Sequence, residues 1–152
     1  MSGLESLYQE LILDHSKRPH GKGLGAEAAE GRVAESFQRN PICGDEITLR
    51  VRLSDDGSAV EEVTWDGAGC SISQASASML AALVEEEERM PRAEASVLID
   101  GFREALRSRG EIPLDEEVFG DAAALSGVSK FTARVKCAML AWVAFEDAIA
   151  RA

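Results

Sequence analysis

Cysteine is scarce in this 152-residue chain, with three residues at Cys43, Cys70 and Cys137. Small secreted proteins that depend on disulfides have more cysteines for their length, and usually an even number of them. The first residues include Glu5 and Glu10 and have no continuous apolar stretch, so neither a secretory signal nor an Arg-rich transit peptide is predicted. We therefore expect reduced thiols and a cytoplasmic location.

Basic residues are also in deficit, with 16 Lys and Arg against 27 Asp and Glu and a net charge of -11. A charge of this sign repels phosphate, so nucleic acid and anionic lipid are not predicted partners. The longest strongly apolar run, 137–145, is far shorter than the ~20 residues of a membrane-spanning helix. Hydrophobic residues make up 45% of the chain, enough for one core, and we expect a single domain over residues 1–152.

Hydrophobic periodicity predicts a helix at each end of the chain. Apolar residues recur at helical spacing over 4–12, and again, in steps of four and three, over 131–149. Between them, the sequence at 71–74 fits a capping box with Ser71 at the N-cap, which predicts another helix start. Shorter helices are expected over 92–108 and 114–125.

Strict alternation of apolar and polar residues over 47–53 predicts a half-buried strand. The Asp56-Gly57 pair that follows is a hairpin signal, and 60–65 is the predicted antiparallel partner. A weaker strand is expected at Arg32–Arg39. Together these segments predict a three-stranded meander.

The meander brings two cysteines to the same end of the sheet. The turn that holds Cys43 connects the first two strands, and the third strand delivers Cys70 to that end. On the last helix, Cys137 lies roughly 120° from the centre of the apolar stripe, where it can face a site at the edge of the core. Each cysteine could instead be a small buried hydrophobe.

Asp45, two residues after Cys43, adds a carboxylate to these thiols, although on its own it could simply be a turn residue. Three thiolates and one carboxylate suit tetrahedral Zn²⁺, and the same groups could hold an iron–sulfur cluster. His15 and His20 are possible substitute ligands, but we expect both at the surface near the end of the first helix.

Several motifs resemble the IscU and SufU group of iron–sulfur assembly proteins, which are similar to the N-terminal domain of NifU. They are Asn40-Pro-Ile-Cys43-Gly-Asp45, the segment 67–78, Arg134-Val-Lys-Cys137-Ala, and Leu7-Tyr8 with Asp14-His15 near the amino terminus. The resemblance spans nearly the whole chain. It implies an α+β fold, a small three-stranded antiparallel sheet packed by helices with a long C-terminal helix. It also implies a metal site formed by Cys43, Asp45, Cys70 and Cys137.

Within this group, the chain is similar to the SufU branch. It has Lys136 where IscU-type scaffolds usually carry a His, it lacks their Leu-Pro-Pro-Val-Lys motif, and its segment between Cys70 and Cys137 is longer. The resemblance implies a zinc-dependent sulfurtransferase that takes persulfide sulfur from a SufS-type cysteine desulfurase. Pyridoxal phosphate would belong to that partner, and downstream iron–sulfur assembly proteins would receive the sulfur.

Cys43 is the predicted sulfur acceptor, because a thiol in a loop bounded by Pro41 and Gly44 can leave a metal at the least structural cost. Arg134 lies one helical turn before Cys137, where its charge could favour nearby thiolates or an incoming persulfide, although a surface ion pair explains it equally well. Two alternatives remain open. One is an IscU-like scaffold for a transient iron–sulfur cluster, and the other is a module in which zinc serves only folding.

Overall fold

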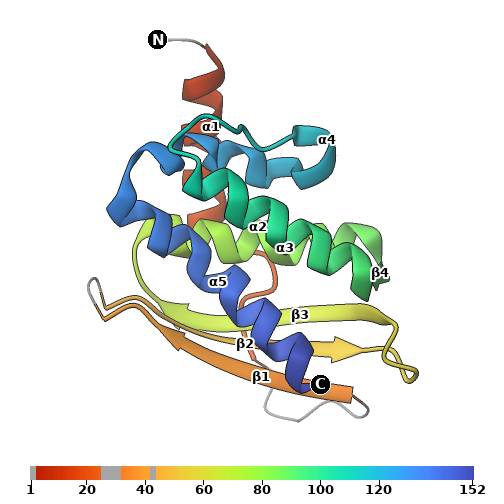
Figure 1. The fold of residues 1–152 in the computed structure, drawn as a ribbon. Helices are drawn as coiled ribbons and strands as arrows, with labels where there is room; N and C mark the ends of the chain where they lie inside the picture. Colours follow the sequence, from red (N-terminus) through yellow and green to blue (C-terminus); the bar gives the residue numbers. More distant parts are fainter. Residues whose placement is uncertain (1–2, 25–31, 42–43) are drawn as a thin grey trace.

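The computed structural model describes residues 3–24, 32–41 and 44–152 (Figure 1). Its elements follow the chain in this order: α1 (Gly3–Lys17), β1 (Arg32–Arg39), β2 (Glu46–Leu53), β3 (Ala59–Ala68), α2 (Ser71–Glu87), β4 (Met90–Pro91), α3 (Arg92–Arg107), α4 (Glu116–Phe119), the 3-10 helix η1 (Gly120–Lys130) and α5 (Thr132–Arg151). This is the expected combination of an antiparallel sheet with packed helices and a long C-terminal helix.

The sheet is an antiparallel meander in the order β1-β2-β3-β4. The predicted alternation in β2 is confirmed, since Leu49 and Val51 are fully buried while Thr48 and Arg50 are only half-buried. At the predicted hairpin, the Gly57 N–H donates to the Ser54 carbonyl at 2.8 Å, and Gly57 has a φ of 74° that a glycine adopts without strain.

The expectation of three strands was wrong, because β4 adds a fourth. It is two residues long, with Met90 paired with Val60 and Pro91 with Ala59 of β3. Two residues are too short to show alternation, and a proline ordinarily argues against a strand. Pro91 is tolerated here because β4 is an edge strand of the sheet. The N–H that proline lacks is therefore not needed to pair with a further strand.

The helices cover one face of the sheet, as Figure 1 shows. α5 packs across β1 and β2, α2 packs on β3, and α1 lies against α2. Between the helices, the ring of Trp142 stacks on that of Phe102 with centroids 4.1 Å apart, and both side chains are fully buried. In the described part of the chain, no helix is long and apolar enough to cross a membrane.

Two helix predictions need correction. The helix expected over 114–125 is instead α4, one turn long, followed by η1, because Gly120 leaves helical geometry with a φ of 55°. The last helix begins at Thr132, and Phe131, predicted to lie on the buried stripe, is its N-cap and is 63% exposed. The α3 prediction agrees to within one residue.

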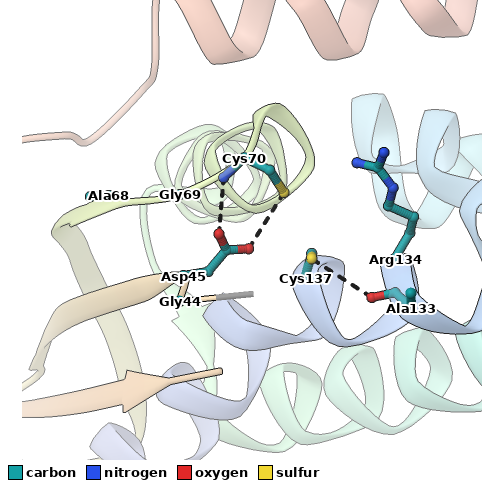
Figure 2. Close-up of a pocket in the computed structure, with 8 residues that line it drawn as sticks. All are labelled: Gly44, Asp45, Ala68, Gly69, Cys70, Ala133, Arg134 and Cys137. Carbon is teal, nitrogen blue, oxygen red and sulfur yellow. Dashed lines mark hydrogen bonds between the residues drawn. The ribbon is translucent and has the colours of Figure 1, made fainter. Parts of the chain in front are cut away.

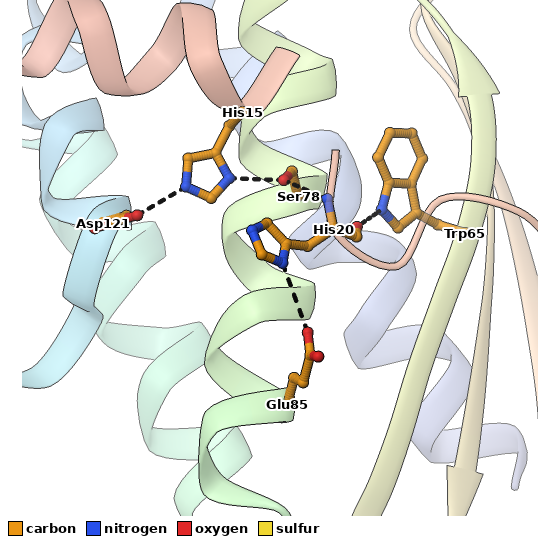
Figure 3. Close-up of polar contacts among 6 residues, drawn as sticks. All are labelled: His15, His20, Trp65, Ser78, Glu85 and Asp121. Carbon is orange, nitrogen blue, oxygen red and sulfur yellow. Dashed lines mark hydrogen bonds and ion pairs between the residues drawn. The ribbon is translucent and has the colours of Figure 1, made fainter. Parts of the chain in front are cut away.

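His15 was expected at the surface and is in fact buried, at 4% exposure. Its ring lies between α2 and η1, with Nδ1 2.6 Å from the hydroxyl of Ser78 and Nε2 2.8 Å from a carboxylate oxygen of Asp121 (Figure 3). The Ser78 hydroxyl also accepts the His20 N–H at 2.8 Å. These contacts tie α1 and the segment after it to the other helices.

Candidate metal centre

Three separate parts of the chain bring one ligand atom each to a single point (Figure 2). Asp45 precedes β2, Cys70 joins β3 to α2, and Cys137 lies in the second turn of α5. Their carboxylate and sulfur atoms all lie within 4.8 Å of one another. The meander predicted that Cys70 converges with Cys43, which lies outside the described residues, and the helical spacing predicted that Cys137 can face a site at the edge of the core. The structure places Cys70 and Cys137 beside Asp45.

Asp45 reaches the site through a tight turn. The Gly44 N–H donates to the Asn40 carbonyl and the Asn40 N–H donates to the Asp45 carbonyl, each at 2.8 Å. Gly44 has a φ of 76°, a conformation that favours glycine. The turn leaves Asp45 with 2% of its surface exposed, so its carboxyl group is held away from bulk water.

Cys70 is the N-cap of α2, one residue earlier than the capping box predicted. Its N–H donates to Asp45 Oδ1 at 3.0 Å, and its thiol lies 3.4 Å from Asp45 Oδ2. In place of the predicted pairing of Ser71 with Gln74, the carboxyl group of Asp45, the residue before β2, caps the start of α2. Ser73, in the first turn of α2, donates its hydroxyl to the Cys70 carbonyl at 3.0 Å.

Sequence reasoning overlooked Gly69 and Ser73. A Cβ atom on Gly69 would lie 2.6 Å from both Asp45 Oδ1 and Ser73 Oγ, so only a glycine lets this strand end approach the carboxylate. The available signal was the glycine that directly precedes Cys70, since glycine marks places where backbone and side chain come close.

Cys137 is 4% exposed, and its thiol lies 3.8 Å from the Ala133 carbonyl one turn earlier. Its sulfur faces an open cleft of about 400 Å³. The cleft is lined by Gly44, Asp45, Ala68, Gly69, Cys70, Ala133, Arg134 and Cys137. In the view of Figure 2, Arg134 rises from α5 on the side of Cys137 away from Asp45. The cleft thus gives ligands from outside access to the sulfur atoms.

Cys43 lies outside the described residues, so its predicted place in the site stays a prediction. The two histidines lie elsewhere, His15 with Ser78 and Asp121, and His20 with its Nδ1 3.6 Å from a carboxylate oxygen of Glu85. Neither histidine is among the described residues that line the cleft.

The donor set fits zinc. Two thiols and a buried carboxylate are zinc ligands, and Zn–S bonds of about 2.3 Å in a tetrahedron place sulfur atoms about 3.8 Å apart. The 4.8 Å spread of the three ligand atoms is slightly wider, a difference that small side-chain rotations can close. The soft sulfur ligands fit an iron–sulfur cluster as well. A hard cation such as Mg²⁺ would be served poorly, because it requires oxygen ligands.

Comparison with known proteins is consistent with this geometry. Residues 7–150 match the family described as NifU-like N terminal domain. The chain is 37% identical over 150 residues to the zinc-dependent sulfurtransferase SufU of Bacillus subtilis, with 99% of this chain and 94% of that protein covered. It is 40% identical over 153 residues to the iron–sulfur cluster assembly scaffold protein IscU of Streptococcus pyogenes, with 99% and 87% covered.

A solved structure shows the same fold. It is the crystal structure of an iron–sulfur cluster assembly scaffold protein for the SUF system from Fervidobacterium islandicum. That structure superposes with a TM-score of 0.75 at 30% sequence identity, and the match covers 95% of this chain and 98% of that one.

Proposed function

This chain belongs to the IscU/SufU family of iron–sulfur cluster assembly proteins, which carry the NifU-like N-terminal domain, and from that premise we propose that it is a zinc-dependent sulfur acceptor. In this proposal it receives persulfide sulfur from a SufS-type cysteine desulfurase and passes it on to downstream iron–sulfur assembly proteins. It is a sulfurtransferase that acts with that partner, in the cytoplasm.

The observation that carries the proposal is the convergence of Asp45, Cys70 and Cys137 at an open cleft. A zinc site that serves only folding is usually closed to molecules from outside, whereas these three ligand atoms lie at a cleft from which a partner can reach them. The relative named for zinc-dependent sulfur transfer, at 37% identity over nearly the full chain, supports the same reading.

Cys43 is the proposed fourth ligand and the sulfur acceptor. It directly precedes Gly44 in the sequence, and Gly44 lines the cleft. Only a thiolate is nucleophilic, and bound zinc would supply the deprotonation of its thiol ligands. Asp45, Cys70 and Cys137 would hold the metal while Cys43 reacts.

The transfer itself is a thiol–disulfide type exchange. The Cys43 thiolate attacks the outer sulfur of the desulfurase persulfide, a new S–S bond forms on Cys43, and the desulfurase cysteine leaves as a thiolate. No external oxidant or reductant is consumed. Because the Arg134 side chain lines the cleft, its positive charge can attract the anionic persulfide and stabilise the negative charge on the sulfur atoms.

The test is a sulfur-transfer assay with a SufS-type desulfurase and cysteine. The chain should accelerate alanine formation, and intact-mass analysis should find one added sulfur atom on Cys43. Cys43→Ser should abolish both effects and leave the desulfurase's own turnover unchanged. Lys17→Gln, an exposed substitution on α1, is a matched control that should behave as the unchanged chain. No stimulation by the unchanged chain would overturn the proposal.

The second candidate function is a scaffold on which a transient iron–sulfur cluster is assembled. It is favoured by the relative at 40% identity that is named as such a scaffold, and it uses the same ligand set. Anaerobic incubation with iron and sulfide distinguishes the two, because a cluster absorbs visible light and zinc does not. A coloured cluster that transfers to an apo-acceptor, without stimulation of the desulfurase, would replace our proposal with this one.

A further inference from the structure

A second groove, separate from the metal cleft, runs between the end of α3 and the outer face of α5. It has a volume of about 440 Å³, and no residue that lines it also lines the cleft. Four of its ten lining residues are cationic and none is acidic, in a chain that has 27 acidic and 16 basic residues. The four cations are Arg103, Arg107, Arg109 and Lys136.

The charge at the start of α5 runs against the helix dipole. The partial positive charge at a helix N-terminus favours Asp or Glu, yet the first turn of α5 has no acidic residue and Lys136 lies in its second turn. Lys130, just before the helix, folds over Gly110, where an added Cβ would meet its side chain at 3.0 Å. This concentration of positive charge costs folding free energy, and a bound anion would offset that cost.

Arg109 is held toward the groove in an unusual backbone conformation. Its φ of 57° is a left-handed value that a non-glycine residue adopts at a cost of roughly 1 kcal/mol. The turn is fixed by Ser108, whose hydroxyl donates to the Ala105 carbonyl at 2.7 Å and accepts the Ile112 N–H at 2.9 Å. A non-glycine residue in a left-handed backbone conformation is the kind of strained position that is often found at functional sites.

Not all four cations are equally available. Arg103 already pairs with Glu146 at 2.8 Å and with Asp100 at 3.3 Å. In the part of the chain that the structure describes, Arg107, Arg109 and Lys136 form no such ion pair. These three cations on the rim can therefore pair with acidic groups of a bound molecule.

The floor of the groove is apolar. Its accessible part is formed by the half-buried Val135 and Val143, with the buried Leu106 and Met139 beneath them. A phosphate ion or a nucleic-acid backbone would satisfy the rim and leave this floor uncovered. From the combination of a basic rim with an apolar floor, we propose that the groove docks an acidic segment of a partner protein that inserts a leucine or phenylalanine between its carboxylates.

The chain's own acidic run at 85–88 does not have this chemistry. The nearest large apolar residues before and after it, Val84 and Met90, are 1% and 0% exposed, so this run offers the charge without an anchoring side chain. The proposed occupant is a different protein, and gel filtration tests a second copy as the alternative.

The probe for this surface is a fluorescein-labelled peptide of glutamates with one central leucine and one phenylalanine, titrated with the full chain and followed by anisotropy. The unchanged chain should bind it, more weakly as salt is added. Replacing the glutamates by glutamine, or the two apolar residues by serine, should each weaken binding about tenfold or more.

Arg109→Gly is the decisive variant, because it removes a cation and also suits the left-handed backbone. Peptide affinity should fall about threefold, while the melting temperature stays the same or rises. The double variant Arg107→Gln with Lys136→Gln should weaken binding about tenfold. The matched control, Lys17→Gln with Arg18→Gln, makes the same change in net charge on the exposed end of α1 and should leave affinity within about twofold.

Three results would each overturn the proposal. The first is that the double variant Arg107→Gln with Lys136→Gln binds the peptide with the same affinity as its matched control. The second is that the serine-substituted peptide binds as tightly as the original peptide. If inorganic phosphate also displaces it, the groove is a simple anion site. The third is a dimer in gel filtration that the groove variant abolishes, which would make a second copy the occupant.

Discussion

Asp45 and Cys70 are connected twice, since one carboxylate oxygen accepts the Cys70 N–H at 3.0 Å and the other lies 3.4 Å from the Cys70 sulfur. The first contact places a carboxyl group at the N-terminus of α2, where the helix dipole favours negative charge. The second leaves the same carboxylate beside the Cys70 sulfur, in the proposed zinc site. One side chain therefore stabilises the helix start and is also placed to be a ligand in the proposed zinc site.

This dual role predicts different results for two substitutions of Asp45. Asp45→Ala removes both the acceptor and the charge, and should lower the free energy of unfolding by about 1–2 kcal/mol even in metal-free protein. Asp45→Asn keeps an amide oxygen for the Cys70 N–H and should cost less. Both should release zinc faster to a chromogenic chelator, and an unchanged release rate would make Asp45 a structural cap only.

The approach of β3 to Asp45 depends on Gly69, so Gly69→Ala should damage the site. Its new Cβ would lie 2.6 Å from Asp45 Oδ1 and Ser73 Oγ, and relieving that overlap should cost about 1–3 kcal/mol and weaken metal binding. Gly127→Ala is the matched control, because nothing lies within 4 Å of an added Cβ there. Chemical denaturation and zinc titration of the two variants test this, and equal stability would contradict it.

The part of the site that could be predicted from sequence is the part governed by short-range rules. Alternation in β2 and the Asp56-Gly57 turn fix the direction of three strands, and strand direction places the segments around Cys70 and Asp45 at one end. Helical spacing then identifies the face of α5 that carries Cys137. None of these steps requires knowledge of distant contacts.

The failed predictions at Cys70 and His15 were decided by long-range contacts, whereas the one at η1 followed from the backbone of Gly120. The capping box matched a local pattern, but the Cys70 N–H found the Asp45 carboxylate, 25 residues away in sequence. The alanines at 122–124 favour an α-helix, yet they form part of η1, where they are buried. His15 was judged by its polar neighbours, whereas its partners, Ser78 and Asp121, lie 63 and 106 residues further along the chain.

Because His15 is buried and hydrogen-bonded, we predict that it stabilises the fold and does not bind the metal. His15→Ala should remove two hydrogen bonds and lower the free energy of unfolding by about 2 kcal/mol or more, because the hydroxyl of the fully buried Ser78 loses a partner. Asp121→Ala should cost less than about 1 kcal/mol, since the Asp121 side chain is 53% exposed. Zinc content should stay the same in both variants, and loss of zinc from His15→Ala would contradict this role.

At the β2–β3 hairpin, the hydroxyl of Ser54, together with the N–H and hydroxyl of Ser58, holds the pKa of Asp56 well below its ordinary value of 3.8. A lowered pKa means that the stabilisation is fully present above pH 3.8 and declines as pH falls toward the folded-state pKa. Asp56→Ala should therefore be less stable than the unchanged chain at pH 7, and the difference should narrow below about pH 4. Urea denaturation from pH 7 to below about pH 4 measures the difference in free energy of unfolding, with Asp55→Ala as the neighbouring control. A difference that does not change with pH would contradict the lowered pKa of Asp56.

The metal centre makes the last prediction, that the purified chain holds one zinc ion bound by three thiolates and a carboxylate. Elemental analysis should find zinc in the unchanged chain and little in Cys70→Ser or Cys137→Ser, because each removes one of the converging ligand atoms. Metal that binds only the folded chain stabilises it by about 4 kcal/mol when free zinc exceeds its Kd a thousandfold. Chelation should therefore lower the melting temperature without abolishing the fold, since the helices and sheet share a core of buried apolar residues. Identical melting curves with and without chelator, or full zinc occupancy in Cys70→Ser, would show that zinc is not bound at this site.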